Sequence, residues 1–450
     1  MRIRRGVAAF VSAGIAALCA QDGKPRLQLD DAGLQAIVAR AVPAVERATG
    51  RKFARPPVVT LADAGDVMRS LRDDLLPQTA AFYQGQPKAR IEKALQLRAD
   101  LFASALLGKY GLHSRELYVL PHFVSTQLAA VKWSDADHAQ ILQLVVLHEL
   151  VHALQDQEIG LAERLARCTA SDTGEAFAML IEGHAVFCSE RAATELELDA
   201  AIPPLRAVFA GAHDPAVVPP CDLTNRRLRG QNGMRYLRGA AFFAAEHARG
   251  GDERCWQVLR TEAPTTRLVL EGPDLPPRRS LAAAFAGIDE RLAGRNWTVG
   301  RGELSGLQVR SENARMLADL EPLLAKWQAG GEWVAMAPTP LAWRALAVLT
   351  FADEASAVAF ALLVENGATR DLRDVGGGRL GEVGDGPAVA GASSRRVVQE
   401  LATDSPVGNR ASLVVVRKGN HVLQLLCNNA PVDDAVVAAV AADVLGRLDG

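Results

Sequence analysis

"AQILQLVVLHELVHALQDQEIG", residues 139–160, is the stretch that decides the fold of this chain. Apolar residues occupy nearly every turn, which predicts one long buried helix that follows a capping-box-like start formed by Ser134 and Asp137 and ends at the final glycine. His148, Glu149 and His152 lie in the middle of this helix. Burying a neutral polar group without a partner costs about 2–7 kcal/mol. These three side chains therefore require partners.

The spacing of the two histidines predicts a metal site. His148 and His152 are four residues apart, so on a helix they share one face, close enough for both imidazoles to bind one ion. In the HExxH motif the intervening glutamate, here Glu149, is the general base that takes a proton from water at a zinc ion. The motif also arises by chance in roughly one such chain in a hundred. The apolar surroundings favour a Zn²⁺ site, because the ion supplies the partners that the polar cluster otherwise lacks.

A third protein ligand is expected on the following helix. Glu182 in "LIEGHA" (180–185) lies thirty residues after His152, and the adjacent Gly183 permits another helix to approach closely. Glu175, two turns earlier on the same face, and His184 are the alternatives. The remaining histidines have no spacing that suggests ligation (His113, His122, His138, His213, His247 and His421).

"HELVHALQD" (148–156) resembles the HELxHAxxD stretch of thermolysin-like gluzincins, which are zinc peptidases with a glutamate as third ligand. Together with "LIEGHA" it is similar, more closely, to a bacterial family of predicted secreted zinc metalloproteases that carry HELTHALQDQ and a later VEGEA-type segment. The similarity extends to "YGLHSRELYVL" (110–120), to "YLRGAAFFAAEHARGG" (236–251) and to pieces of the carboxy-terminal part. It therefore covers most of the chain after residue 20.

This resemblance implies a mainly helical, zincin-like catalytic domain with a small sheet. It implies that His148, His152 and Glu182 are zinc ligands and that Glu149 is the catalytic base. It also implies a structural or supporting role for Asp156.

The chain departs from that family in one segment. The family often shows an S-T-E-Q-x-x-H-P segment, whereas "APTTRLVLEGP" (263–273) has no histidine. If that histidine helps to bind substrate or to stabilise an oxyanion, Tyr236 is the candidate that replaces it. An ordinary packed tyrosine is the alternative interpretation.

The segment before the buried helix is expected to mix helices with two strands. "RELYVLPHF" (115–123) alternates like a strand, and Pro121 confines it to a sheet edge or to its own end. An edge strand near Leu117–Leu120 could hold an extended peptide. The other elements expected here are a helix over 31–49, a strand at 56–62 and helices near 64–84 and 88–108.

Near residue 300 the pattern changes, which predicts a smaller α/β domain over 301–450 after a catalytic domain over 21–300. "RALAVLTFADEASAVAFALLVE" (344–365) is typical of a strand followed by a helix, and "SLVVVRKGNHVLQLLC" (412–427) of a hairpin that turns at Lys418–Asn420 before a last helix. The glycine-rich stretch 373–391 lacks the context of a phosphate loop, so we interpret it as a flexible connection. The whole chain is thus expected to be of the α+β class.

The amino terminus and the cysteines are the features from which the cellular compartment is predicted. Residues 1–20 combine three arginines, an apolar stretch and small residues before a polar segment, which is the pattern of a signal peptide and predicts a secreted or periplasmic protein. An uncleaved membrane anchor or a lipid anchor is the alternative interpretation. Five cysteines then remain, and a disulfide is expected to be possible between two of the first four (Cys168, Cys188, Cys221 and Cys255).

Composition limits the partners. The chain has 450 residues, of which 50 are basic and 52 acidic, with no long run of one sign, so nothing indicates binding to nucleic acid. No apolar stretch beyond the signal peptide approaches the ~20 residues of a membrane-spanning helix. The sequence predicts a secreted zinc metallopeptidase acting on peptides or proteins. The alternatives are a non-catalytic scaffold stabilised by zinc and a zinc hydrolase of non-peptide bonds.

Overall fold

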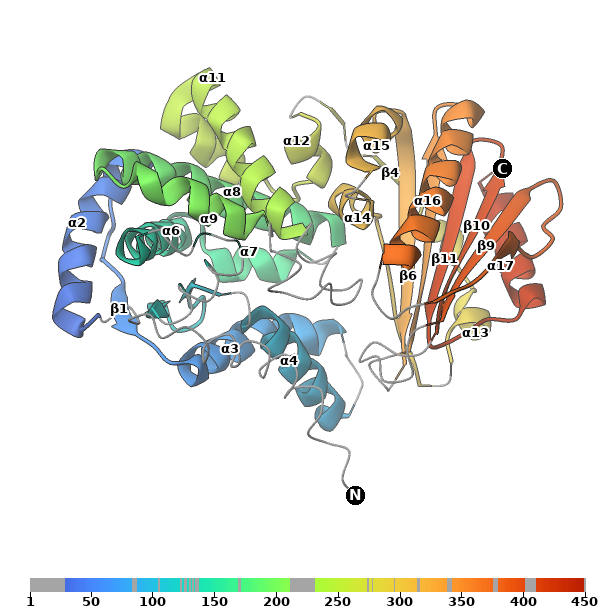
Figure 1. The fold of residues 1–450 in the computed structure, drawn as a ribbon, viewed down its shortest axis with the longest axis horizontal. Helices are drawn as coiled ribbons and strands as arrows, with labels where there is room; N and C mark the ends of the chain where they lie inside the picture. Colours follow the sequence, from blue (N-terminus) through green and yellow to red (C-terminus); the bar gives the residue numbers. More distant parts are fainter. Residues whose placement is uncertain are drawn as a thin grey trace. The chain divides into compact units, whose positions relative to one another are not determined.

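The computed structural model describes residues 29–448 with several gaps (83–86, 104–105, 122–123, 125–127, 129–130, 132, 134–136, 169–170, 211–230, 273–274, 277, 295, 314–315, 338–341, 375–378 and 401–409). The predicted signal peptide, Cys221, His122 and His213 lie outside the described residues. The chain is of the α+β class, as predicted, and divides into two compact units (Figure 1). The first comprises residues 1–169, 176–219 and 232–264, and the second comprises 170–175, 220–231 and 265–450.

The first unit is mainly helical and is built around α6 (His138–Ile159). The Asp137 side chain caps this helix by accepting from the backbone N–H groups of Ala139 and Gln140, and Gly160 ends it with a positive φ of 64°. The end at Gly160 is confirmed, whereas at the start Asp137 itself is the capping residue and Ser134 lies outside the described residues. The other helices around it are α2 (Asp31–Thr49), α3 (Ala64–Phe82), α4 (Lys88–Ala103), α7 (Leu161–Arg167), α8 (Ser171–Glu195), η1 (Asp199–Ala201), α9 (Ile202–Phe209), η2 (Met234–Arg238) and α11 (Gly239–Leu259). The first residues of α8 are part of the second unit.

A small sheet with strand order β1-β3-β2 lies against α6. Its strands are β1 (Val58–Leu61), β2 (Gly108–Tyr110) and β3 (Glu116–Val119); β1 pairs with β3 in parallel and β2 pairs with β3 in antiparallel fashion. Of the two placements predicted from Pro121, the sheet edge is wrong, because β3 pairs on both sides, whereas the end of the strand is confirmed. Pro121 lies beyond the last residue of β3, so it removes no ladder hydrogen bond and does not prevent pairing on both sides. β2, whose first residue falls at the end of the helix predicted near 88–108, is one of the two outer strands, and β1 is the other.

The second unit contains one large sheet in the order β4-β6-β7-β11-β10-β9-β8, with β5 also paired to β6. Its strands are β4 (Arg279–Ser280), β5 (Thr298–Gly302), β6 (Trp327–Met336), β7 (Trp343–Phe351), β8 (Arg379–Asp385), β9 (Ser393–Glu400), β10 (Arg410–Lys418) and β11 (His421–Asn428). The helices are α12 (Thr266–Leu270), η3 (Ala282–Phe285), α13 (Asp289–Leu292), α14 (Gly306–Glu312), α15 (Leu317–Leu324), α16 (Glu354–Asp374) and α17 (Asp434–Gly446). The hairpin β10–β11 and the strand and helix β7–α16 are confirmed.

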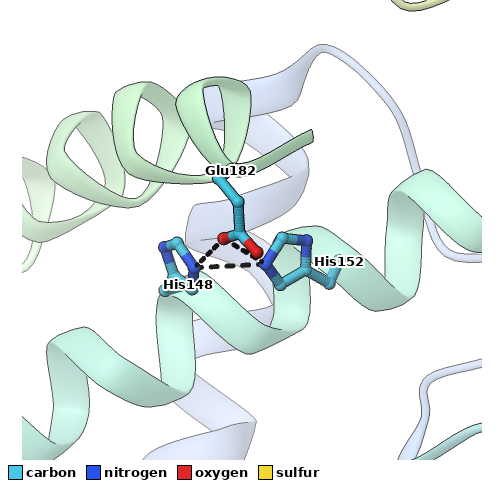
Figure 2. Close-up of side chains that lie close together, drawn as sticks. All are labelled: His148, His152 and Glu182. Atoms are coloured by element: carbon cyan, nitrogen blue, oxygen red, sulfur yellow. Dashed lines mark hydrogen bonds and ion pairs between the residues drawn. The ribbon is translucent and has the colours of Figure 1, made fainter. Parts of the chain in front are cut away.

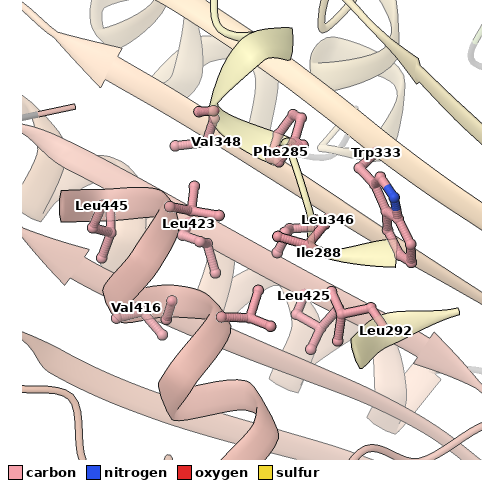
Figure 3. Close-up of a cluster of buried hydrophobic side chains, with 14 of the residues drawn as sticks. Phe285, Ile288, Leu292, Trp333, Leu346, Val348, Val416, Leu423, Leu425 and Leu445 are labelled. Carbon is pink, nitrogen blue, oxygen red and sulfur yellow. The ribbon is translucent and has the colours of Figure 1, made fainter. Parts of the chain in front are cut away.

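Both faces of this sheet carry a buried core. Side chains alternate along β7, so that Leu346 and Val348 belong to one core whereas Leu349 and Phe351 belong to the other. The first core packs against η3, α13 and α17, and the second against α14, α15 and α16 (Figure 1). Figure 3 shows the first core, in which Phe285 and its neighbours from η3 and α13 lie over the central strands.

Three further expectations are corrected. The long continuous part of the second unit begins at Thr265, whereas the predicted boundary is at residue 301, because β4 and β5 pair with β6 and are thus part of its sheet. The glycine-rich stretch 373–391 is not only a connection, since it contains the strand β8 at the end of the sheet. Cys168, Cys188 and Cys255 are free thiols, so no disulfide joins any two of them.

Within the described residues, we find no helix with the length and apolar character needed to cross a bilayer.

Candidate metal centre

The first unit brings together side chains from α6 and α8, two helices that are separated in the sequence by the short helix α7. His148 and His152 project from one face of α6, and Glu182 projects from α8 towards the space between their rings (Figure 2). The Nε2 atoms of the two histidines are 3.1 Å apart. Glu182 Oε2 lies 3.3 Å from the His148 Nε2 and 3.2 Å from the His152 Nε2. These three residues form a buried group that could hold a metal ion.

The donor set and its spacing fit a tetrahedral ion. Zinc binds histidine nitrogen at about 2.0–2.1 Å and carboxylate oxygen at about 2.0–2.2 Å. Two corners of a regular tetrahedron with such bonds are about 3.3 Å apart. The three distances of 3.1–3.3 Å match this edge. Three protein ligands would leave one position of such a tetrahedron for another ligand.

The charges in the cluster favour an ionised carboxylate. Burial by itself raises the pKa of Glu182, but the imidazoles of His152 and His148 outweigh it and hold that pKa well below its usual range. Burial likewise lowers the pKa of His152, yet the Glu182 carboxylate outweighs this effect and raises the pKa of His152 to about 9. In the metal-free protein a proton on His152 thus balances the carboxylate. A metal cation would replace that proton.

Glu149, on the same helix, faces the small sheet. The residue is 9% exposed, and its Oε2 accepts the backbone N–H of Tyr110 on β2 at 2.7 Å. The strand β2 passes close to α6 because its first residue, Gly108, has no side chain. A Cβ there would lie 2.9 Å from Val145 Cγ1 and 3.1 Å from Glu149 Cγ. β2 thereby holds the predicted base in one orientation.

Asp156 anchors the same strand from the next turns of α6. Its Oδ2 accepts the hydroxyl of Tyr110 at 3.0 Å, and its Oδ1 accepts the backbone N–H of Leu161 at 2.9 Å, at the start of α7. Its predicted structural role is thus confirmed. Tyr110, which was not recognised as a site residue, contacts α6 through both its backbone and its hydroxyl.

Tyr236 lies beside the cluster. It belongs to η2, a single π-helical turn, a local irregularity that is frequent at functional sites. Its ring centroid is 5.9 Å from that of His148, and the ring stacks on Phe209 at 4.3 Å. Burial, with the charges of Glu182 and Glu149 and a hydrogen bond to Glu182, raises the pKa of the phenol well above its ordinary value. Tyr236 is therefore a neutral hydrogen-bond donor at neutral pH.

Close packing of two helices places Glu182 and Tyr236 next to each other. A Cβ on Gly183 would lie 2.3 Å from the backbone carbonyl carbon and 2.4 Å from the Cα of Gly239, which directly follows η2. The predicted use of Gly183 for close helix approach is confirmed. Both positions need glycine because backbone meets backbone there.

The alternatives for the third ligand lie outside the cluster. Among the described residues the group that could hold a metal comprises His148, His152 and Glu182, without Glu175 or His184. His184 lies behind His152 and is separated from it by Gln155, whose Nε2 is 3.1 Å from His184 Nδ1. It packs between Phe243 and Trp256, and burial lowers its pKa to about 3. The described histidines among the remaining six also lie outside the group (His113, His138, His247 and His421).

Two residues of the site were missed in the sequence. Gln155 lies three residues after His152, and a search for polar side chains on the ligand-bearing face of α6 would have found it. Tyr110 had no local signal in the sequence, because its contacts depend on how β2 packs.

Comparisons of this chain with protein-family models, with curated proteins and with solved structures find no match.

Proposed function

We propose that this protein is a zinc-dependent metallopeptidase, with His148, His152 and Glu182 as zinc ligands and Glu149 as general base. The observation that carries the proposal is the set of three ligand atoms, 3.1–3.3 Å from one another, which fits three corners of a zinc tetrahedron. Two imidazole nitrogens and one carboxylate oxygen are the donor set of thermolysin-type zinc enzymes. The resemblance of "HELVHALQD" to gluzincins supports the same chemistry.

Each polar side chain then has a distinct task. Bound at this centre, zinc would supply Lewis acidity and make a water molecule acidic enough to ionise near neutral pH. Glu149 would take the proton of that water on Oε1, because Tyr110 engages Oε2, and would later pass it to the leaving amine. Tyr236 would turn its hydroxyl from Glu182 towards the oxyanion that develops on the scissile carbonyl.

The outer strand β2 supports a peptide as the substrate class. An extended peptide can add to a sheet at an outer strand through backbone hydrogen bonds. β2 lies on the side of the sheet opposite to β1, and its residue Tyr110 donates its backbone N–H to Glu149. A peptide added at β2 would run next to the general base.

The test is metal analysis of the purified full chain together with proteolysis of a diverse peptide library, with and without chelator. We expect about one zinc per chain, cleavage of peptides, loss of cleavage with chelator and its return with zinc. Glu149→Gln is the matched control, since it should retain the metal without cleavage. Bound zinc with no cleavage would support the scaffold alternative instead. Cleavage of small esters or amides but not of peptides would support a non-peptide hydrolase.

A further inference from the structure

A fully buried glutamine lies directly behind the metal-binding group. Gln155 is one turn after His152 on α6, and its side chain has no solvent exposure. Its amide contacts three polar groups: the backbone carbonyl of Ile181 at 3.0 Å, the Nδ1 of His152 at 2.9 Å and the Nδ1 of His184 at 3.1 Å. The chemistry of these partners fixes the orientation of the amide.

The carbonyl of Ile181 determines which end of the amide faces it. A carbonyl oxygen only accepts hydrogen bonds, so the nitrogen of the amide must face Ile181. The oxygen of the amide then faces His152 and can likewise only accept. The proton of a neutral His152 must therefore be on Nδ1. Its Nε2 carries the lone pair that faces His148 and Glu182.

The second N–H of Gln155 completes the arrangement. It is donated to the Nδ1 of His184, which must therefore be an acceptor, and the proton of that ring is on Nε2, 3.3 Å from Cys188 Sγ. The amide oxygen and both N–H groups are thus all engaged. A buried amide with every position satisfied holds a single orientation, because turning it over would oppose donors to donors and acceptors to acceptors.

We propose that Gln155 is a positioning residue of the metal centre: it holds His152 in the tautomer that offers Nε2 to the ion, and it ties α6 to α8 beside Glu182. The second effect follows because Ile181 directly precedes Glu182. Partners of this kind behind a ligand typically change metal affinity by about 10–100-fold when they are removed. This inference rests on the proposed zinc site.

The experiment measures zinc affinity by chelator competition in the full chain, with circular dichroism as the check of folding. Gln155→Met keeps the size of the side chain but removes all three hydrogen bonds, so zinc affinity should fall by about 10–100-fold. Gln155→Glu keeps an acceptor for the Nδ1 proton of His152 but loses the donors to Ile181 and His184, so it should restore only part of the lost affinity. Gln157→Met is the matched control on the same helix, because Gln157 contacts Ala54 and Arg55 rather than the cluster. It should bind zinc normally.

A second measurement covers the case in which Gln155→Met does not fold. In the zinc-loaded unaltered chain with ring-¹⁵N histidine, nuclear magnetic resonance should place the proton of His152 on Nδ1 and the metal on Nε2. The reverse pattern would overturn the inference, as would a folded Gln155→Met variant with unchanged zinc affinity. If the unaltered chain binds no zinc, the proposed site fails and the inference fails with it. If the unaltered chain and the Gln155→Met variant bind zinc equally well, the role of Gln155 is rejected while the proposed zinc site stands.

Discussion

At the scale of single residues, our proposal gives metal binding and proton transfer to different side chains that are neighbours in the sequence. His148 faces the Glu182 carboxylate, whereas Glu149 faces the backbone of Tyr110. Consecutive residues on a helix point about 100° apart, so the two cannot share one contact. This separation makes the two tasks accessible to separate substitutions.

Glu149→Gln tests proton transfer. Glutamine keeps the size of the side chain and can still accept from the N–H of Tyr110, but it cannot act as a base. We expect zinc content and thermal stability to remain close to the unaltered values, while kcat falls by about 10²-fold or more. Retained turnover in a zinc-loaded variant would exclude Glu149 as the base.

Glu182→Ala and Glu175→Ala together test the third ligand. Glu182 lies within 3.3 Å of both histidines, whereas Glu175 is two turns away on the same helix. Loss of Glu182 should abolish stoichiometric zinc binding and destabilise the first unit, because two buried imidazoles lose their carboxylate. Glu175→Ala should retain zinc. The opposite pattern in metal analysis would transfer the ligand role to Glu175.

Tyr236→Phe tests the proposed oxyanion donor. The phenylalanine keeps the stacking on Phe209 and removes only the hydroxyl. We expect zinc to remain bound and kcat to fall by about 10²-fold, which is the usual effect of removing one such donor. A kcat within twofold of that of the unaltered protein would identify Tyr236 as a packed tyrosine only.

At the scale of elements, the site depends on how closely α8 and α11 approach each other. Gly183→Ala would place a methyl group 2.3 Å from the backbone of Gly239, so one of the helices must move. We expect a loss of about 1–3 kcal/mol in the free energy of unfolding together with weaker zinc binding, since Glu182 moves with α8. Denaturant unfolding and chelator competition measure the two effects.

Gly446→Ala is the control for that substitution. It lies at the end of α17, and no atom lies within 4 Å of an added Cβ. Neither stability nor zinc binding should fall in this variant. A Gly183→Ala protein that matches it in both properties would contradict the role of the close approach.

At the scale of the whole molecule, the limits of the second unit determine which fragment can fold. Phe285, Ile288 and Leu292 are fully buried in the first core of the large sheet, and β5 pairs with β6. A fragment of residues 265–450 should therefore fold, whereas one of residues 301–450 lacks these side chains and should not. Loss of a single buried phenylalanine side chain alone costs about 3–5 kcal/mol. Circular dichroism and thermal unfolding of both fragments check this, and equal stability would contradict the boundary at Thr265.

By itself, the sequence determined the features that depend on residues close together in the chain. The ends of α6, the common face of His148 and His152 and the hairpin β10–β11 follow from caps, a four-residue spacing and a short turn. These are local properties of the backbone.

Only the tertiary structure decided which glutamate meets the histidines, which strand lies beside Glu149 and where the second unit begins. Glu175 and Glu182 are equivalent by spacing, and the close contact of Gly183 with Gly239 belongs to the position of Glu182 alone. β3 became a central strand because β1 and β2, distant in the sequence, pair with its two edges. Such choices depend on contacts between distant segments, and neither periodicity nor motif spacing records those contacts.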